Sequence, residues 1–140
     1  MSARHRARRR ALDVLFAADM RQTDPLVVLA EAQQLRTDEG GSAINPYAAE
    51  LVEGVVQHRE RIDEILSTYS LGWQLDRMPG VDRAALRIAT YEVLWGGVPE
   101  GVALDEAVEL VGELSTDESP SFVNGLLGRI VEMRATIDVD

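Results

Sequence analysis

Apolar residues recur at helical spacing along nearly the whole chain. Between about residues 6 and 20, Ala11, Leu12, Leu15 and Ala18 make a broad apolar face. No segment alternates apolar and polar positions as a half-buried strand would. The pattern predicts an all-α fold of about seven helices. The first two predicted helices cover residues 6–20 and 25–36, the third starts at residue 46, and the fourth contains residues 62–69. The fifth lies between breaks at 78–80 and 96–97, and the last two cover 104–115 and 119–137.

Three of these helices are predicted to begin with a side-chain cap followed by proline. The pairs are Asp24-Pro25, Asn45-Pro46 and Ser119-Pro120. The oxygen of the first residue accepts a bond from the otherwise unpaired amides of the first turn, where proline loses no needed donor. The polar, glycine-containing loop over residues 37–44 is expected to divide the chain into two packed helical subdomains.

Composition narrows the classes of protein further. At 140 residues, one domain over residues 1–140 is expected. The absence of cysteine excludes disulfides, cysteine-ligated zinc and a thiol nucleophile. No apolar stretch is long enough to span a membrane, so we expect a cytoplasmic protein without membrane contact.

Catalysis is difficult to assemble from this sequence. The two histidines, His5 and His58, are expected to be solvated, on a flexible arm and on a charged helix face. Neither a metal-binding spacing nor a phosphate-binding glycine loop occurs. We therefore expect no enzyme activity, no metal and no cofactor.

The charge distribution is strongly asymmetric. The first ten residues form a basic arm with five arginines, Arg4, Arg6, Arg8, Arg9 and Arg10. Because the whole chain has a formal net charge of -10, these five leave -15 on residues 11–140. On a helix, Arg6, Arg9 and Arg10 share one side. Such a cluster favours phosphate binding, and the acidic body would repel nucleic acid from other surfaces. A basic tail that neutralises the acidic body within a dimer remains the alternative.

Single-stranded nucleic acid also needs flat side chains for base stacking. Phe16 and Phe122 are candidates, although either could belong to the core. Asn124, Gly125 and Gly128 all lower helix propensity near Phe122. The two glycines are expected to allow close approach of another helix, and Asn124 to bond a neighbouring loop.

Four stretches, in the same order and spacing, resemble the NusB family of bacterial transcription antitermination factors. They are RARRRALDVLF at 6–16, VDRAALRIATYEVL at 81–94, VPEGVALDEAVELV at 98–111 and SPSFVNGLLGRI at 119–130. All 14 basic residues are arginine, which points to actinobacterial relatives. The resemblance implies seven helices in two subdomains. It also implies binding of the single-stranded boxA element of ribosomal RNA leader transcripts together with NusE, a ribosomal protein, in the antitermination complex of RNA polymerase.

The resemblance also implies roles for individual residues. The residues implied to bind RNA are Arg4, Arg6, Arg8, Arg9, Arg10, Phe16, Glu118, Phe122 and Asn124. Phe16 stands where the family commonly has tyrosine. Asp82 and Glu92 are implied to contact NusE, with Asp82 standing for a family glutamate.

Three other functions stay open at this stage. NusB-like domains also assist RNA-modifying enzymes, but 140 residues leave no room for a methyl-donor domain. A helix-turn-helix DNA binder would need a basic helix within the acidic body. A homodimer that masks the arm as a storage form is the third alternative.

Overall fold

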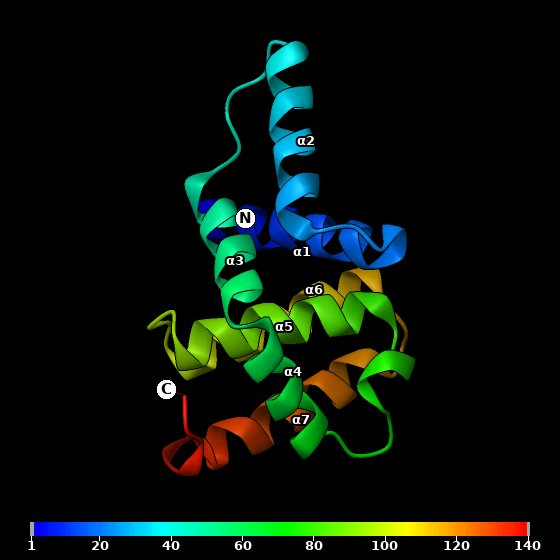
Figure 1. Ribbon diagram of the computed structural model, residues 1–140. Coiled ribbons are helices and arrows are strands. Elements are labelled where there is room, and N and C mark those ends of the chain that lie inside the picture. Colours follow the sequence, from blue (N-terminus) through cyan, green and yellow to red (C-terminus); the bar gives the residue numbers. More distant parts are fainter. Residues whose placement is uncertain (1, 140) are drawn as a thin grey trace.

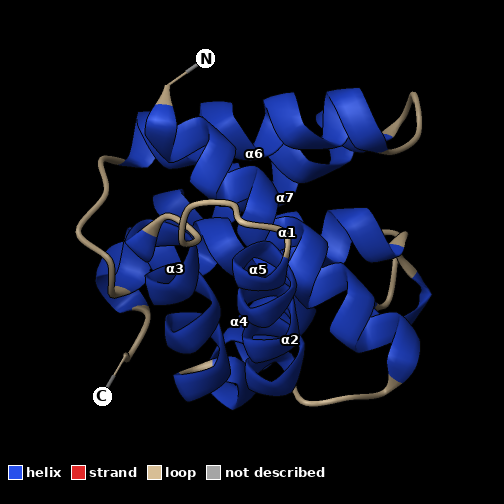
Figure 2. Cartoon of the chain, turned by 90° about the horizontal axis from the view of Figure 1, so that it is seen from above, coloured by secondary structure: helices blue, strands red, loops and turns tan. Residues whose placement is uncertain are grey.

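The computed structural model describes residues 2–139, and in this range it contains seven α-helices and two 3₁₀ helices. Figure 2 shows helices and loops without a strand, as the apolar pattern predicted. The elements are α1 (Ala3–Arg21), α2 (Pro25–Asp38), α3 (Pro46–Gln57), α4 (Arg59–Tyr69), η1 (Leu75–Arg77), α5 (Gly80–Leu94), α6 (Glu100–Leu114), α7 (Ser119–Glu132) and η2 (Arg134–Thr136). No helix within the described range has the length and hydropathy needed to cross a bilayer.

The first helix begins earlier than predicted. Ser2 caps α1 by accepting a 3.0 Å hydrogen bond from the His5 amide, and helical structure starts at Ala3 rather than near residue 6. The described part of the arm predicted for residues 1–10 is therefore the first part of α1. Met1 lies outside the described residues. Consequently, Arg4 and His5 are helical as well, and the whole run from Arg4 to Arg10 belongs to one helix.

Two of the three predicted caps are confirmed. Asp24 and Asn45 each accept a 2.9 Å bond from the amide two residues later, with proline at the first helical position. The prediction for Ser119 is wrong, because this residue lies inside α7 and is fully buried. Its hydroxyl accepts from the Thr116 amide at 3.2 Å and donates to Ser115 at 3.0 Å. The hydroxyl thus closes the turn before α7 instead of capping the helix.

The helices form two groups that differ from the predicted division. Helices α1, α2 and α3 pack against one another, and α4 to α7 form the second group around α5 (Figure 1). The 37–44 loop joins α2 to α3, so it lies within the first group. The boundary falls at His58, where α3 ends and α4 begins.

Helix α5 is the centre of the fold. It contacts α1, α3, α4, α6 and α7, and every residue from 84 to 90 is buried. The main core runs through both groups of helices, from Leu12 and Leu15 of α1 through Leu86 to Leu127 of α7. Each large apolar side chain buried in this way stabilises the fold by roughly 1.5–3 kcal/mol. This core fixes α1, and with it the arginine-bearing helix end, to the body.

Close helix approach occurs at a glycine that the sequence analysis did not single out. A Cβ placed on Gly54 of α3 would lie 2.2 Å from the Tyr91 ring of α5. At Gly128 a Cβ would meet nothing within 4 Å, and at Gly125 only the Arg129 guanidinium at 3.5 Å. The prediction of close backbone approach at residues 125 and 128 is therefore wrong.

Candidate nucleic-acid interface

The exposed cationic surface lies at the N-terminal end of α1. We call Arg4, Arg6, Arg9 and Arg10 the basic helix end. Arg4, Arg6 and Arg9 are exposed and Arg10 is partly exposed. As the helical spacing predicted, Arg6, Arg9 and Arg10 share one side of α1, where they line a hollow of about 280 Å³ together with Asp13.

Weak contacts orient two of these guanidinium groups. Arg4 lies 4.3 Å from the centroid of the Tyr47 ring, which is a cation–π distance. Arg9 Nη1 lies 3.7 Å from Glu113 Oε2, but the Arg9 side chain remains 46% exposed. Exposed ion pairs of this kind contribute little to stability. The Arg9 guanidinium can therefore leave Glu113 and bind another anion. The basic helix end can therefore receive phosphate groups without dismantling the fold.

Arg8 is the exception among the arginines, and its assignment to an RNA-binding surface is corrected. Its side chain is only 3% exposed, and Arg8 Nε donates to both Glu92 carboxylate oxygens, at 2.9 and 3.2 Å. Arg8 precedes Leu12 by four residues and Leu15 by seven, so it continues the apolar face of α1 into the protein. That spacing is the sequence signal that separates Arg8 from Arg9 and Arg10.

Glu92 likewise does not reach the surface, so its predicted contact with NusE is corrected. The residue is 1% exposed and receives a hydrogen bond from the Tyr47 hydroxyl in addition to the Arg8 pair. Burial raises the pKa of Glu92, against the opposing influence of Tyr47 and Arg8. Burial and the bond to Glu92 also raise the pKa of the Tyr47 hydroxyl, which therefore remains a donor. This network ties α1, α3 and α5 together.

His5 is buried rather than solvated, contrary to the prediction. It is 4% exposed, and His5 Nδ1 lies 2.5 Å from Glu106 Oε2 on α6. Together with Glu109 and Glu113, His5 offers ligand atoms that lie within 4.8 Å of one another. The Arg9 guanidinium beside Glu113 opposes the binding of a cation by this group. The contact between His5 and Glu106 joins the start of α1 to α6 and so anchors the helix start.

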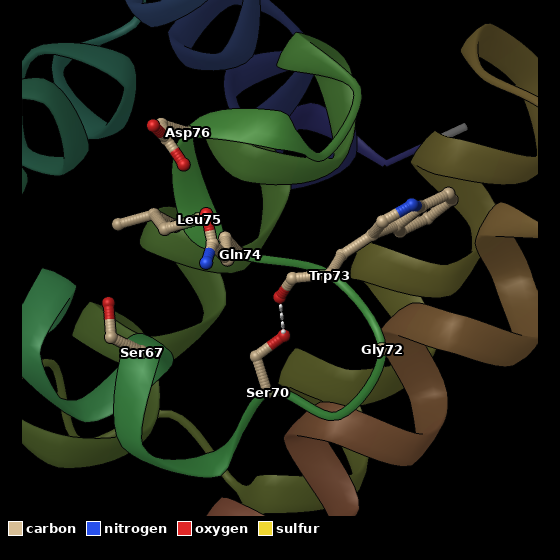
Figure 3. A pocket seen from close by; sticks show the side chains of 7 residues that line it. All are labelled: Ser67, Ser70, Gly72, Trp73, Gln74, Leu75 and Asp76. Atoms are coloured by element: carbon tan, nitrogen blue, oxygen red, sulfur yellow. Dashed lines mark hydrogen bonds between the residues drawn. The ribbon is translucent and has the colours of Figure 1, made fainter.

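An aromatic pair lies on a different part of the molecule. The Phe122 and Trp73 rings meet edge to face, with centroids 4.8 Å apart, and both are partly exposed. Trp73 belongs to a loop around a hollow of about 500 Å³, where the Ser70 hydroxyl donates to the Trp73 carbonyl at 2.6 Å (Figure 3). Sequence reasoning considered only the phenylalanines. A tryptophan in a glycine-containing loop was the available signal for this second ring.

The remaining RNA candidates on α7 lie near Phe122 in sequence. Glu118 is exposed at the N-cap position of α7, four residues before Phe122. Asn124 is exposed as well. Within residues 2–139 its side chain makes no hydrogen bond to a neighbouring loop, so that prediction is wrong.

Phe16 of α1 and Asp82 of α5 differ in how far their side chains are exposed. Phe16 is half-buried against the start of α5, where a Cβ on Gly80 would lie 2.9 Å from its ring. Asp82 is fully buried, which corrects its predicted exposure to NusE. Neither carboxylate oxygen of Asp82 has a hydrogen-bond partner within the described residues. It stands in the first turn of α5, at the positive end of the helix dipole.

The predicted residues therefore do not form one compact site. Arg6 and Phe16 are separated by ten residues of one helix, a rise of about 15 Å. The arginines lie at one end of α1, Phe16 lies towards the other end, and Phe122 is carried by α7. A ligand that touched all of them would have to be extended, as a single strand of nucleic acid is.

Comparison with known proteins supports the same assignment in sequence and fold. The sequence model of the NusB family matches residues 5–132. A transcription antitermination protein NusB of the actinobacterium Kineococcus radiotolerans is 59% identical over 138 residues, which cover 98% of each chain. A solved structure of T. maritima NusB has a TM-score of 0.82 at 32% identity, covering 94% of this chain and 92% of the other. A structure of NusB and NusE in complex with dsRNA has a TM-score of 0.80 at 30% identity, covering 94% and 98%. Since the similarity in sequence and in fold spans nearly the entire length, this chain belongs to the NusB family.

Proposed function

We propose that this chain is a non-enzymatic transcription antitermination factor of the cytoplasm. It binds the single-stranded boxA element of ribosomal RNA leader transcripts jointly with NusE, within the antitermination complex of RNA polymerase. The observation that carries this proposal is the basic helix end, in which four arginines project from one rigid, capped helix terminus.

The physical basis of capture is electrostatic. Arginine stays charged at all relevant pH values, and its planar fork matches two phosphate oxygens. The N-terminus of α1 adds the positive end of the helix dipole at the same place. The net charge of -15 on residues 11–140 repels RNA from the rest of the protein and so favours this orientation.

Base stacking supplies the second part of the mechanism. Phe122 and Trp73 present partly exposed rings, and Phe16 presents a half-buried one. Stacking of a base on such a ring contributes roughly 1–3 kcal/mol. Glu118 and Asn124, which are exposed and lie within four residues of Phe122 in sequence, are suited to hydrogen-bond the edges of an unpaired base.

The similarity to antitermination proteins favours NusE as the partner. The solved relative that contains NusE and RNA covers 94% of this chain at 30% identity. Because Asp82 and Glu92 are buried, the contact with NusE would have to use other side chains on the surface of the acidic body.

A salt titration with matched RNAs tests the proposal. Binding of a boxA-type RNA and of a scrambled RNA is measured by fluorescence anisotropy, with and without NusE. Four arginine–phosphate contacts predict that log K falls against log salt concentration with a slope of roughly -3. We expect NusE to strengthen binding of the boxA-type RNA but not of the scrambled RNA. A salt-independent affinity, or equal affinity for both RNAs with NusE present, would refute the proposal.

A further inference from the structure

A second hollow shares Arg6 and Arg10 with the hollow that Asp13 lines. It has a volume of about 580 Å³ and lies between the start of α1, the last turn of α2 and the start of α3. Arg36 of α2 lines it together with Arg6 and Arg10. We call this hollow the Arg36 groove. Its size is in the range of ordinary ligand sites.

The Arg36 side chain is held in place by the loop that follows α2. Arg36 Nε donates to the Ser42 carbonyl at 2.8 Å, and Arg36 Nη2 donates to the Ser42 hydroxyl at 3.3 Å. The loop is itself anchored, because the Gly41 amide donates to the Arg36 carbonyl at 2.8 Å. A guanidinium has five N–H donors, so about three remain for a ligand. Such a fixed group loses little conformational entropy when it binds.

The charged residues that line the described part of the Arg36 groove are all basic. Its described lining contains three arginines and no carboxylate, whereas the neighbouring hollow includes Asp13. The N-terminus of α3 also faces the groove, at Asn45 and Pro46. The Asn45 side chain already takes the Tyr47 amide and proline has none, so α3 contributes its dipole rather than donors.

The floor of the groove is apolar. Ala7 is 1% exposed and Ile44 is 6% exposed, and both line it. Low-dielectric walls strengthen the attraction between a guanidinium and an anion. No aromatic ring lines the described groove, so it offers nothing on which a base could stack. These features fit a sugar-phosphate backbone rather than a base.

We infer that Arg36 is a further RNA-binding residue, which holds a backbone phosphate in the Arg36 groove. This inference rests on the proposed function, because it extends the path of the same RNA. Arg6 and Arg10 line both hollows, so they join the groove to the rest of the basic helix end without a break. Since phosphate contacts carry no sequence information, Arg36 contributes affinity without selectivity.

Substitutions that remove the positive charge of Arg36 test this inference with the full chain. R36A and R36Q are compared with R134A, which removes one arginine at η2, far from α2 in Figure 1. Arg134 is exposed, and within residues 2–139 its ion pair is with Glu100, at 2.8 Å. R36Q keeps an amide that can donate to Ser42, so it serves if R36A loosens the loop, and circular dichroism checks folding.

We expect R36A and R36Q to weaken RNA binding at least about 10-fold at low salt, as loss of one hydrogen bond to a charged group does. The loss should be equal for boxA-type and scrambled RNA. The slope of log K against log salt should become less negative by about 0.7. R134A should change neither quantity.

The failures of the two proposals are distinguishable. If R36Q binds RNA like R134A while R9A weakens binding, the inference about Arg36 is overturned and the proposed function stands. A loss confined to boxA-type RNA also overturns it, since that would indicate a base contact. If neither R9A nor R36Q weakens binding, the proposed function itself fails.

Discussion

Arg8 Nε lies 2.9 Å from Glu92 Oε2, in an ion pair whose side chains are 3% and 1% exposed. The pair joins the arginine-bearing end of α1 to the central helix α5. The next residue, Arg9, has a side chain that is 46% exposed and faces solvent. Two adjacent arginines of one basic run therefore serve different purposes, one holding the helix in place and the other available to an anion.

Replacing these neighbours by alanine should separate stability from binding. Arg8→Ala leaves the Glu92 carboxylate buried beside only the Tyr47 hydroxyl, and we expect a loss of roughly 3–5 kcal/mol in the free energy of unfolding. Arg9→Ala should cost less than about 0.5 kcal/mol but weaken RNA binding. Urea denaturation and anisotropy titrations measure the two effects. Equal destabilisation by both variants would show that the Arg8–Glu92 pair does not hold the fold.

Two glycine-to-alanine changes should alter stability in opposite directions. At Gly54 the added Cβ would lie 2.2 Å from the Tyr91 ring, so overpacking should cost about 1–3 kcal/mol despite better helix propensity. At Gly128 the Cβ would enter open space, and the gain in propensity should stabilise the protein by about 0.5–1 kcal/mol. Thermal unfolding of both variants checks the prediction. A stabilised Gly54→Ala protein would mean that α3 and α5 are not in close contact.

Acid should weaken the junction of α1, α4 and α5. Asp19 accepts from Arg83 at 3.0 Å and from Arg87 at 2.9 Å, with Arg59 at 3.5 Å. Burial by itself raises the pKa of Asp19, but these arginines together lower it below the ordinary value of 3.8. Because the pKa is depressed in the folded state, the ionised group stabilises the protein above pH 3.8. That contribution is lost as pH falls through the lower folded value.

The acid effect is measured against a variant that lacks the carboxylate. Asp19→Asn should lose about 2 kcal/mol at pH 7 and show a shallower fall in unfolding free energy below pH 4 than the unchanged protein. Asp105→Asn, at an exposed position of α6, is the control and should keep the original slope. The pKa of Glu92 is raised in the folded protein, so its effect on the unfolding free energy as pH falls is opposite to that of Asp19. Parallel acid slopes for Asp19→Asn and the unchanged chain would contradict the assignment.

The aromatic pair should contribute to RNA affinity through stacking. Phe122→Leu keeps an apolar side chain beside Trp73 but removes the flat face, and we expect RNA to bind roughly 5- to 100-fold more weakly. Trp95→Phe, which retains a ring next to His58, is the matched control and should bind normally. With Trp95 replaced, Trp73 is the sole tryptophan, and its fluorescence should change when RNA is added. Unchanged affinity in Phe122→Leu would place the RNA elsewhere.

The sequence by itself determined the features that depend on near neighbours along the chain. Helical spacing gave the all-α fold, and the Asp24-Pro25 and Asn45-Pro46 pairs marked the starts of two helices. The four matching stretches identified the family. All of these signals lie within a few turns of one helix or within a short stretch of sequence, so they can be recognised without the structure.

Only the tertiary structure decided which charged groups reach the surface. The spacing of Arg8 to Leu12 and Leu15 places its side chain on the inner face of α1, but its partner Glu92 is 84 residues away in sequence and is found only when α1 packs on α5. Asp82 and Glu92 were placed at a partner surface by resemblance, yet the packing of α5 between its neighbours buries both. The Arg36 groove also exists only because folding brings Arg36 of α2, the start of α1 and the segment before α3 around one hollow. Burial and charge pairing depend on contacts between distant segments, and these are fixed when the helices pack.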